Sequence, residues 1–226
     1  MLFRSGIQLE KGVITLLESR NNPTGIRNDL LAYAEANGKF LKEEFTFTNE
    51  QGKEAKGEKK IGYAPNDPKK FVLVITDHLR KISLERIGGN PANLKQCIDK
   101  YLEYSVELRN LCGYSFLHII HLNRSITDPV RMKQAGDLLY PNGDDVKDSG
   151  NLSEEADFMF TLFNPNDERY NLTKHFGDQI KDGNGNELYP NLRSLHLVEN
   201  RHGDAPIHWR LNMFGNIKKF EHLEIT

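Results

Sequence analysis

The stretch 70–77, Lys-Phe-Val-Leu-Val-Ile-Thr-Asp, constrains the fold more than any other part of the sequence. Five apolar residues, Phe71 to Ile75, follow one another without alternation, directly after the turn-rich cluster 65–68. A continuous apolar run of this length predicts a strand that is buried on both faces, as in parallel sheets covered by helices. Asp77 then lies at the carboxyl end of that strand, which is the edge where open parallel sheets bind ligands.

Asp77 allows two interpretations. An acid at the end of such a strand can hold Mg²⁺ on a bound nucleotide, as the second acidic motif of P-loop ATPases does. Aspartate is also common in turns and at helix N-termini, where it bonds backbone amides. The apolar run by itself favours the second interpretation, so the first depends on the rest of the chain.

Composition and charge exclude several classes of protein. The 226 residues suit one domain. A formal net charge of −2 provides no overall excess of positive charge for binding DNA, so DNA binding would need a local basic patch. No apolar run approaches the ~18 residues of a membrane helix, and the N-terminus lacks the apolar core of a signal peptide. We therefore expect a cytoplasmic protein with no membrane partner.

Hydrophobic periodicity predicts alternating helices and strands. Helices are expected over about 26–36, with Thr24 as the N-cap, and over about 92–111, ended by Gly113. The strand, helix and strand from Phe71 to Leu122 should form a parallel crossover. A helical turn is expected at 152–156, and further strands at 12–17, 45–48, 60–63, 157–163, 192–199 and 207–213.

Two polar segments interrupt this pattern. Residues 49–60 predict a solvated hairpin tip or a mobile insertion. Gly52 and Gly57 have the spacing of a phosphate loop, but Glu58 and Lys59 follow them and no buried strand precedes them, so we reject a phosphate loop there. Residues 124–150 form a polar stretch of unusual length, which is typical of a functional or a disordered loop.

The histidines and the last hairpin carry weaker signals. His118 and His121 are three residues apart in a predicted strand and therefore face opposite sides, which argues against a shared metal site. Alternation from Ile207 to Met213 predicts a half-exposed antiparallel strand at a sheet edge. Arg201 lies at the tip of this hairpin, where an arginine is most often a solvated turn residue.

The order of these pieces resembles the C-terminal ATPase domain of DnaB-type replicative helicases, phage versions in particular, over about residues 22–223. Residues 72–78, Val-Leu-Val-Ile-Thr-Asp-His, resemble the second acidic ATPase motif, and 119–125, Ile-Ile-His-Leu-Asn-Arg-Ser, resemble the strand ending in Gln-Leu-Asn-Arg. Residues 145–157 resemble the family's Asp-Leu-Arg-x-Ser-Gly stretch, and 197–203 its Lys-x-Arg-x-Gly hairpin. Each motif is weak by itself, but four in order are fairly specific.

The resemblance implies an α/β fold with a RecA-like, mostly parallel sheet flanked by helices and a C-terminal antiparallel hairpin, as one partial domain over 1–226. It implies ATP and Mg²⁺ as cofactors. Asp77 would coordinate Mg²⁺ through water, and His121 stands where the family has a glutamine that senses the γ-phosphate. Arg201 would be the arginine finger that reaches the nucleotide of the neighbouring subunit, where positive charge stabilises the transferring phosphoryl group.

The same resemblance implies a hexameric ring with single-stranded DNA in its channel. Residues 124–150 would line that channel. Arg124, Lys133 and Lys147 are the candidate contacts to DNA phosphates.

Three features depart from the family pattern. His121 replaces the usual glutamine, and Glu199 replaces the lysine that accompanies the finger, which reverses a charge near a triphosphate. The sequence also contains no phosphate loop, which the family carries on its central strand. The fold is therefore expected to be incomplete, with a gap in the sheet that exposes unpaired backbone and apolar surface.

Three functions follow in order of preference. The first is the C-terminal portion of a ring-forming helicase that couples ATP hydrolysis to duplex unwinding, inactive by itself and completed by a P-loop-bearing partner segment. The second is a catalytically inactive helicase-like scaffold that acts as a binding or regulatory protein. The third is an unrelated α/β enzyme that uses Asp77 in a cleft, for which the sequence shows no partner base.

Overall fold

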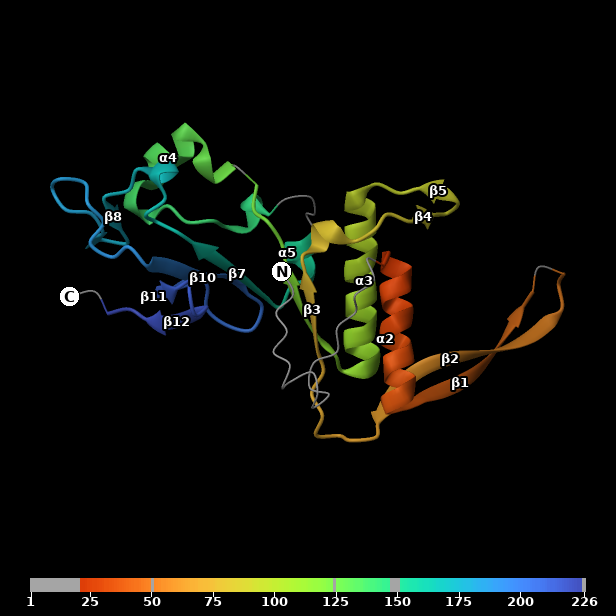
Figure 1. Cartoon of the computed structure of the whole chain (residues 1–226). Coiled ribbons are helices and arrows are strands. Elements are labelled where there is room, and N and C mark those ends of the chain that lie inside the picture. Colours follow the sequence, from red (N-terminus) through yellow and green to blue (C-terminus); the bar gives the residue numbers. More distant parts are fainter. Residues whose placement is uncertain (1–20, 50, 124, 147–150, 225–226) are drawn as a thin grey trace.

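The computed structural model of the chain describes residues 21–49, 51–123, 125–146 and 151–224. Figure 1 shows that the chain forms two halves. The N-terminal half, coloured red to green, is built around two long helices, and the C-terminal half, coloured green to blue, is built around an antiparallel sheet. The predicted strand at 12–17 lies outside the described residues.

Two helices form the centre of the N-terminal half. Helix α2 spans Pro23–Asn37, and its N-cap is Asn22, whose side chain accepts a hydrogen bond from the Gly25 amide at 2.8 Å. The predicted cap, Thr24, was wrong because Pro23 takes the first helical position, where a missing amide hydrogen costs nothing. Helix α3 spans Leu94–Cys112 and ends at Gly113 in the left-handed conformation, as predicted.

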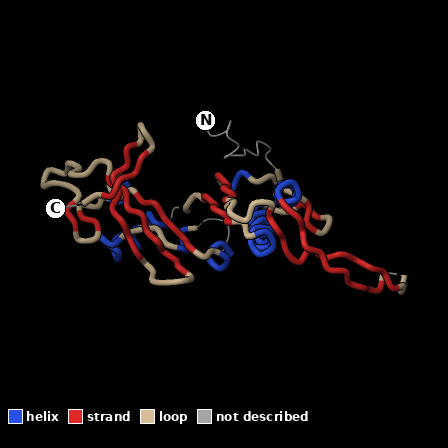
Figure 2. The backbone as a smooth tube through the Cα atoms, turned by 90° about the horizontal axis from the view of Figure 1, so that it is seen from below, coloured by secondary structure: helices blue, strands red, loops and turns tan. Residues whose placement is uncertain are grey.

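A long hairpin follows α2. Strand β1, Gly38–Thr48, pairs antiparallel with β2, Glu54–Pro65, and the hairpin projects away from the rest of the molecule (Figure 2). The segment 49–60 therefore belongs to a hairpin, as one of the two predictions had it, but residues 54–60 are part of strand β2. The backbone ladder continues to the pair of Thr48 and Glu54, and Lys42 contacts Glu58 across it at 2.6 Å.

The predicted parallel crossover is confirmed. Strand β3, Leu73–Asp77, pairs in parallel with β6, Ser115–Ile119, and α3 connects them. One face of β3 packs on α3, where the Thr76 and Tyr101 hydroxyls hydrogen-bond at 2.9 Å.

Burial of β3 on both faces was wrong. Leu73 is 47% exposed and Ile75 is 58% exposed. These two side chains alternate with Val74 and Thr76, which are partly buried. The apolar run therefore presents one covered face and one open face.

The N-terminal core lies between α3 and the segment after β3. Leu79, which follows β3 in a 3₁₀ turn at Leu79–Lys81, packs with Ile98 and Tyr101 of α3. Leu152 joins the same cluster from helix α5, Asn151–Glu155, where a helical turn was predicted. This contact connects the two halves of the chain.

The C-terminal half contains a four-stranded antiparallel sheet in the order β12-β11-β10-β7. Its strands are β7, Phe158–Phe163; β10, Leu192–Asn200; β11, Ile207–Phe214; and β12, Lys219–His222. The predicted hairpin of β10 and β11 is confirmed, but β11 is not at the edge because β12 covers it. Two-residue ladders complete the set: β4, Arg86–Ile87, with β5, Asn90–Pro91, and β8, Lys174–His175, with β9, Asp178–Gln179.

The described part of the segment 124–150, residues 125–146, is more ordered than a polar loop. It contains α4, Pro129–Ala135, and 3₁₀ turns at Ser125–Thr127, Gly136–Leu138 and Gly143–Asp145. Ile126 and Leu139 from this segment enter the second core with Phe163, Ile180 and Leu192. Apolar anchors at wide spacing therefore fold a segment that looks polar along the sequence.

The fold is mixed α/β, with parallel pairing shown for β3 and β6. A mostly parallel sheet was expected, whereas the other described ladders are antiparallel. Among the described strands, none pairs with the second edge of β6 or of β7. Of the helices described, none is long and apolar enough to cross a membrane.

Candidate functional site

Asp77 lies where the sequence predicted it, at the carboxyl end of β3. It pairs with Ile119 in the parallel register, and its side chain is exposed. The buried Leu79, two residues later, anchors the backbone that follows. The carboxylate is thus held at the edge of the sheet and is free to contact a ligand from solvent.

His121 reaches the same edge from the end of β6. Its ring packs edge-on against His78, with 4.3 Å between the ring centroids. Burial lowers the pKa of His78, and the nearby His121 and Lys81 lower it further. His78 is therefore neutral at pH 7, and its buried Nδ1 atom has no hydrogen-bond partner within the described structure.

His118, three residues before His121, has separate contacts. Its ring packs against Tyr101 at 5.4 Å between centroids, inside the half formed with α3. Burial lowers the pKa of His118 to about 4. The two histidines do not form one site, as their spacing indicated.

A buried ion pair fixes the segment that leaves β6. Asp145 is fully buried, and Arg131 contacts both of its carboxylate oxygens at 2.5 and 2.8 Å. Burial would raise the pKa of Asp145, but hydrogen bonds from Arg131, Ser125 and the Asn142 amide together hold it below its ordinary value. The Asn123 amide donates to the Asp145 carbonyl at 2.7 Å, which ties the end of β6 to this pair.

Sequence reasoning missed this ion pair. Arg131 and Asp145 were both visible as charged residues of the polar segment, but their partnership is not local. A charge that is 0% exposed must be paired, and that requirement makes the segment rigid rather than loose.

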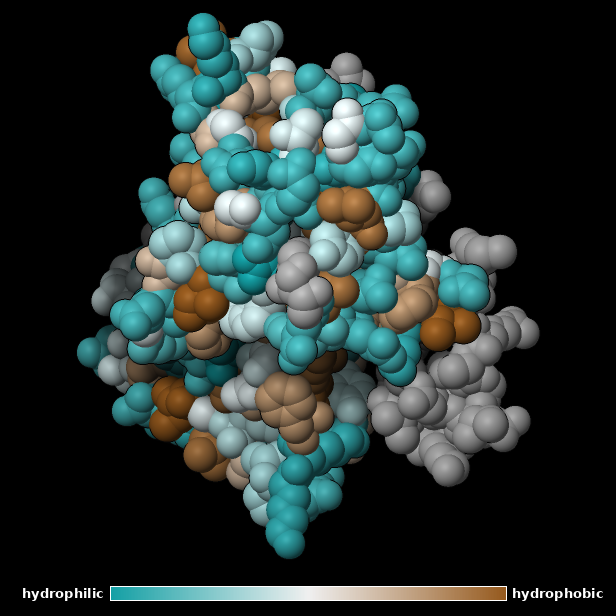
Figure 3. Space-filling model, turned by 90° about the vertical axis from the view of Figure 1, so that its left-hand side faces the viewer, coloured by the Kyte–Doolittle hydropathy of each residue, from teal (hydrophilic) through white to brown (hydrophobic). Residues whose placement is uncertain are grey.

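Of the three candidate DNA contacts, Lys133 is exposed on α4. Arg124 and Lys147 lie outside the described residues. The side of the molecule that carries the C-terminal half is mostly hydrophilic, with hydrophobic side chains scattered over it (Figure 3).

Arg201 lies beside the start of β7, close to α5 and to the last turn of α3. Its backbone amide donates to the Asp157 carbonyl at 2.9 Å, directly before β7 begins. Its guanidinium donates to the Glu154 carbonyl and lies 3.8 Å from the Asp157 carboxylate, which Arg109 also contacts at 3.1 Å. Asp77 ends a strand, whereas Arg201 flanks the start of one, and the chain does not bring them into one site.

Glu199, the residue that replaces a lysine in the helicase pattern, packs beside Gly143. A Cβ atom at position 143 would meet the Glu199 Oε1 atom at 2.7 Å, so glycine permits the close approach. Burial raises the pKa of Glu199, and the negative charge of Asp144 raises it further. Its carboxylate therefore faces the 143–145 turn.

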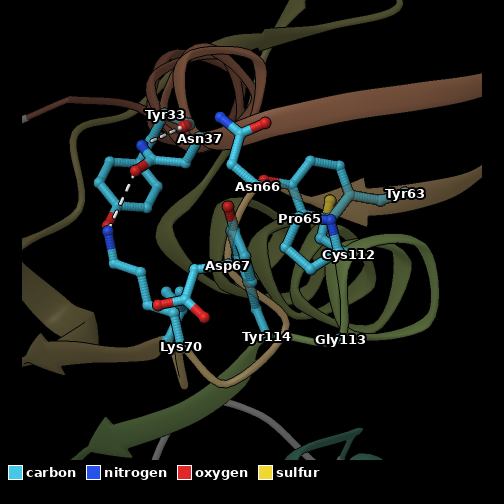
Figure 4. Close-up of a pocket in the computed structure, with 11 residues that line it drawn as sticks. Tyr33, Asn37, Tyr63, Pro65, Asn66, Asp67, Lys70, Cys112, Gly113 and Tyr114 are labelled. Atoms are coloured by element: carbon cyan, nitrogen blue, oxygen red, sulfur yellow. Dashed lines mark hydrogen bonds between the residues drawn. The ribbon is translucent and has the colours of Figure 1, made fainter.

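A small pocket of about 210 Å³ lies at the opposite end of β3 from Asp77. Figure 4 shows Tyr33, Asn37, Lys70 and Tyr114 around it, with Lys70 donating to the Asn37 side chain at 3.0 Å. Burial raises the pKa of the lining Cys112 thiol to about 11. Because a thiol is reactive only as a thiolate, this cysteine is not an activated nucleophile.

A second buried polar cluster lies in the C-terminal half. The Ser194 hydroxyl hydrogen-bonds to Nε2 of His175 at 2.9 Å and to Nε2 of His196 at 2.8 Å. Burial lowers the pKa of His175 to about 4 and that of His196 to about 3. Although serine beside histidine suggests nucleophilic chemistry, Ser194 is only 1% exposed, so the cluster is part of the core.

Asp77 fits Mg²⁺ bound through water, because Mg²⁺ keeps several waters and needs few carboxylates from the protein. Among the described residues, no group of three or more histidine, cysteine or acidic side chains could hold a metal ion directly.

No protein-family model matches the chain. The curated proteins also show no match. Among solved structures, the fold is similar to that of a DnaB-like replicative helicase whose interactions with primase were also determined, with a TM-score of 0.51 and 18% sequence identity. The likeness covers 70% of this chain and 32% of the helicase chain, and at this identity it shows a relationship of fold alone.

Proposed function

We propose that this chain is the C-terminal portion of a ring-forming replicative DNA helicase, which couples ATP hydrolysis to duplex unwinding once a P-loop-bearing partner segment completes its site. One observation carries the proposal. An exposed acid, Asp77, ends a strand that pairs in parallel with β6 across α3, within a fold similar to that of a DnaB-like replicative helicase. An acid at this edge suits a nucleotide with its cation.

The residues at this edge have separate roles in the proposal. Asp77 holds the water shell of Mg²⁺, and the cation neutralises charge on the phosphates when it is bound. His121 lies at the end of the neighbouring strand, where it can hydrogen-bond a phosphate oxygen. His78 packs against the His121 ring and restricts its orientation.

Arg201 acts on the nucleotide of a neighbouring subunit. Its side chain is 45% exposed, and it must exchange the Glu154 carbonyl and the Asp157 carboxylate for phosphate oxygens. Arg109 stays within 3.1 Å of Asp157, so this acid keeps a cationic partner when Arg201 leaves. The exchange therefore leaves no carboxylate without a cationic partner, which favours an arginine finger that can move to the nucleotide.

Lys133, exposed on α4, is the described candidate for contact with single-stranded DNA phosphates. Such contacts are electrostatic and independent of base sequence, as a translocating ring requires. The hexamer is proposed from the resemblance.

ATP hydrolysis by the completed assembly tests the proposal. The chain is produced together with the polypeptide encoded directly upstream of its first codon, and phosphate release is followed with Mg²⁺ and single-stranded DNA. Asp77→Asn should abolish turnover while the assembly persists. Asp67→Asn makes the same change of charge before β3 and should leave turnover intact, so equal rates in the two variants would contradict the role of Asp77.

A non-catalytic helicase-like scaffold is the second candidate. Arg201 is held by its own chain, Glu199 stands where the helicase pattern has a lysine, and the sequence lacks a phosphate loop. This alternative predicts no binding of ATP under any mixing condition, which isothermal titration with the assembled complex would measure. An unrelated enzyme built on Asp77 would have the imidazoles of His78 and His121 as neighbouring bases, but no further observation favours such an enzyme.

A further inference from the structure

A groove of about 710 Å³ separates the two halves of the chain. Residues 115–120 of the β6 region form one wall, and residues 158–162 of β7 form the other. Leu102 and Val106 of α3 and Leu152 before β7 complete its lining. The groove is thus bounded by two strands from different sheets and by helices.

Both walls present a free strand edge. β6 pairs with β3 on one side, and β7 pairs with β10 on one side. Within the described chain, the second edge of each strand has no strand partner. Unpaired amide and carbonyl groups of a strand edge favour pairing with another strand.

The walls are also apolar. Leu117 in β6 is 48% exposed, and the other large apolar side chains of the groove walls are exposed to a similar extent: Ile119, Phe158, Phe160 and Leu162. Exposed apolar surface that gathers in one groove marks a site of interaction, in contrast to side chains scattered singly. The occupant must therefore be apolar as well as extended.

Both strands begin at the same end of the groove. β6 starts just after α3 ends at Gly113, and Asp157, directly before β7, contacts Arg109 in the last turn of α3. An extended segment can therefore run along both walls.

We propose that the groove receives an extended apolar strand from a second polypeptide, which hydrogen-bonds to β6 on one side and to β7 on the other. The strand joins the β3–β6 pair and the C-terminal sheet into one continuous sheet. Backbone hydrogen bonds to two edges provide affinity, and the apolar walls select apolar side chains, as in other cases of strand addition. A helix would leave both edges unpaired.

The described strands are already paired in other ladders, so the donor lies outside the described residues, and we assign it to a second polypeptide. The chain also spans only 32% of the length of the solved helicase that it resembles in fold. The identity of the donor as the P-loop-bearing segment rests on the proposed function, whereas the strand site itself rests on the groove.

Hydrogen–deuterium exchange on the full chain tests the strand site without nucleotide. The probe is a synthetic peptide of alternating valine and isoleucine flanked by lysines, and the control peptide has proline at alternate positions. The valine–isoleucine peptide should slow exchange about fivefold or more in both β6 and β7, because each backbone hydrogen bond must open before exchange. The proline peptide should have no effect, since it cannot donate to an edge.

Two variants locate the effect. Leu117→Lys places a charge in the groove and should remove the protection, whereas Leu41→Lys makes the same change in β1, at a side chain 53% exposed, and should not. Protection of only one wall, or only of the outer edges of β3 or β12, overturns the proposal.

Two other occupants are distinguishable. If β6 and β7 of the free chain are already protected and Ile14→Lys removes that protection, the chain's own residues 12–17 fill the groove and the proposal fails. It also fails if light scattering shows a dimer that Leu117→Lys dissociates. An assembly without ATP turnover would refute the proposed function but would not change these exchange results, which are measured without nucleotide. The strand site and the proposed function can therefore be refuted independently.

Discussion

Replacing Arg131 with methionine should destabilise the chain by about 3 kcal/mol, because breaking a buried ion pair typically costs about 3–5 kcal/mol. Asp145 is fully buried and would lose two charged hydrogen bonds of 2.5 and 2.8 Å. Ser125 and the Asn142 amide still donate to its carboxylate. These remaining bonds place the estimate at the lower end of the range.

Urea denaturation measures this change as a lower midpoint at an unchanged slope. The carboxyl pKa of Asp145 is lowered in the folded chain, so its contribution is present at neutral pH and is lost as the pH falls below the ordinary aspartate range. The difference between the wild type and Arg131→Met should therefore shrink in acid.

Two control variants test whether the buried ion pair of Arg131 and Asp145 accounts for the loss of stability. Arg169→Met removes the exposed partner of Asp167 and should shift the midpoint little, because exposed ion pairs contribute little. The double variant Arg131→Met, Asp145→Leu should recover much of the loss, since no charge remains buried. If Arg131→Met costs no more than Arg169→Met, the ion pair does not hold the segment after β6.

Three further outcomes follow from the structure. His175 and His196 are buried as neutral rings with pKa values of about 4 and 3. Their full contribution to the free energy of unfolding should be present above pH 6.5, and about 3 kcal/mol per group should be lost as the pH falls towards 4. Denaturation at a series of pH values measures this loss. Ile98→Ala should cost about 2–5 kcal/mol by urea denaturation, since its side chain is fully buried, whereas Leu84→Ala should cost much less; equal losses would contradict the assigned core. Arg201→Ala should lower ATP turnover of the completed assembly by about 10³–10⁵ while assembly persists, and loss of assembly with turnover retained would refute a finger role.

Local patterns predicted the central crossover well. The apolar runs at β3 and β6 and the spacing of apolar residues in α3 depend on neighbours along the chain, and Gly113 ends the helix by its own conformational freedom. The alternation of β11 likewise predicted its antiparallel pairing with β10.

Burial was harder to predict than secondary structure. The run at β3 predicted a strand covered on both faces, but Leu73 and Ile75 are about half exposed. An apolar run of this kind therefore predicted the strand correctly but not the burial of its two faces.

The segments that contradicted the sequence analysis depend on contacts between distant residues. The β1–β2 hairpin is longer than predicted because backbone pairing between the two strands continues to Thr48 and Glu54 through charged, exposed residues. Arg131 and Asp145 order a segment that looked like a loop. At the candidate site, the shared edge of Asp77 and His121 followed from strand ends, whereas the Arg201 contact with Asp157 did not, because no local pattern encodes it.

The DNA directly upstream of the first codon tests the central claim most directly, namely that a P-loop-bearing segment completes this chain. The account predicts a reading frame, adjoining or interrupted, that encodes an apolar strand followed by Gly-x-x-x-x-Gly-Lys-Ser/Thr, since that loop would hold the phosphates beside Asp77. An upstream region that encodes no such strand and loop would contradict the account, and the ATPase role of Asp77 and Arg201 would be withdrawn.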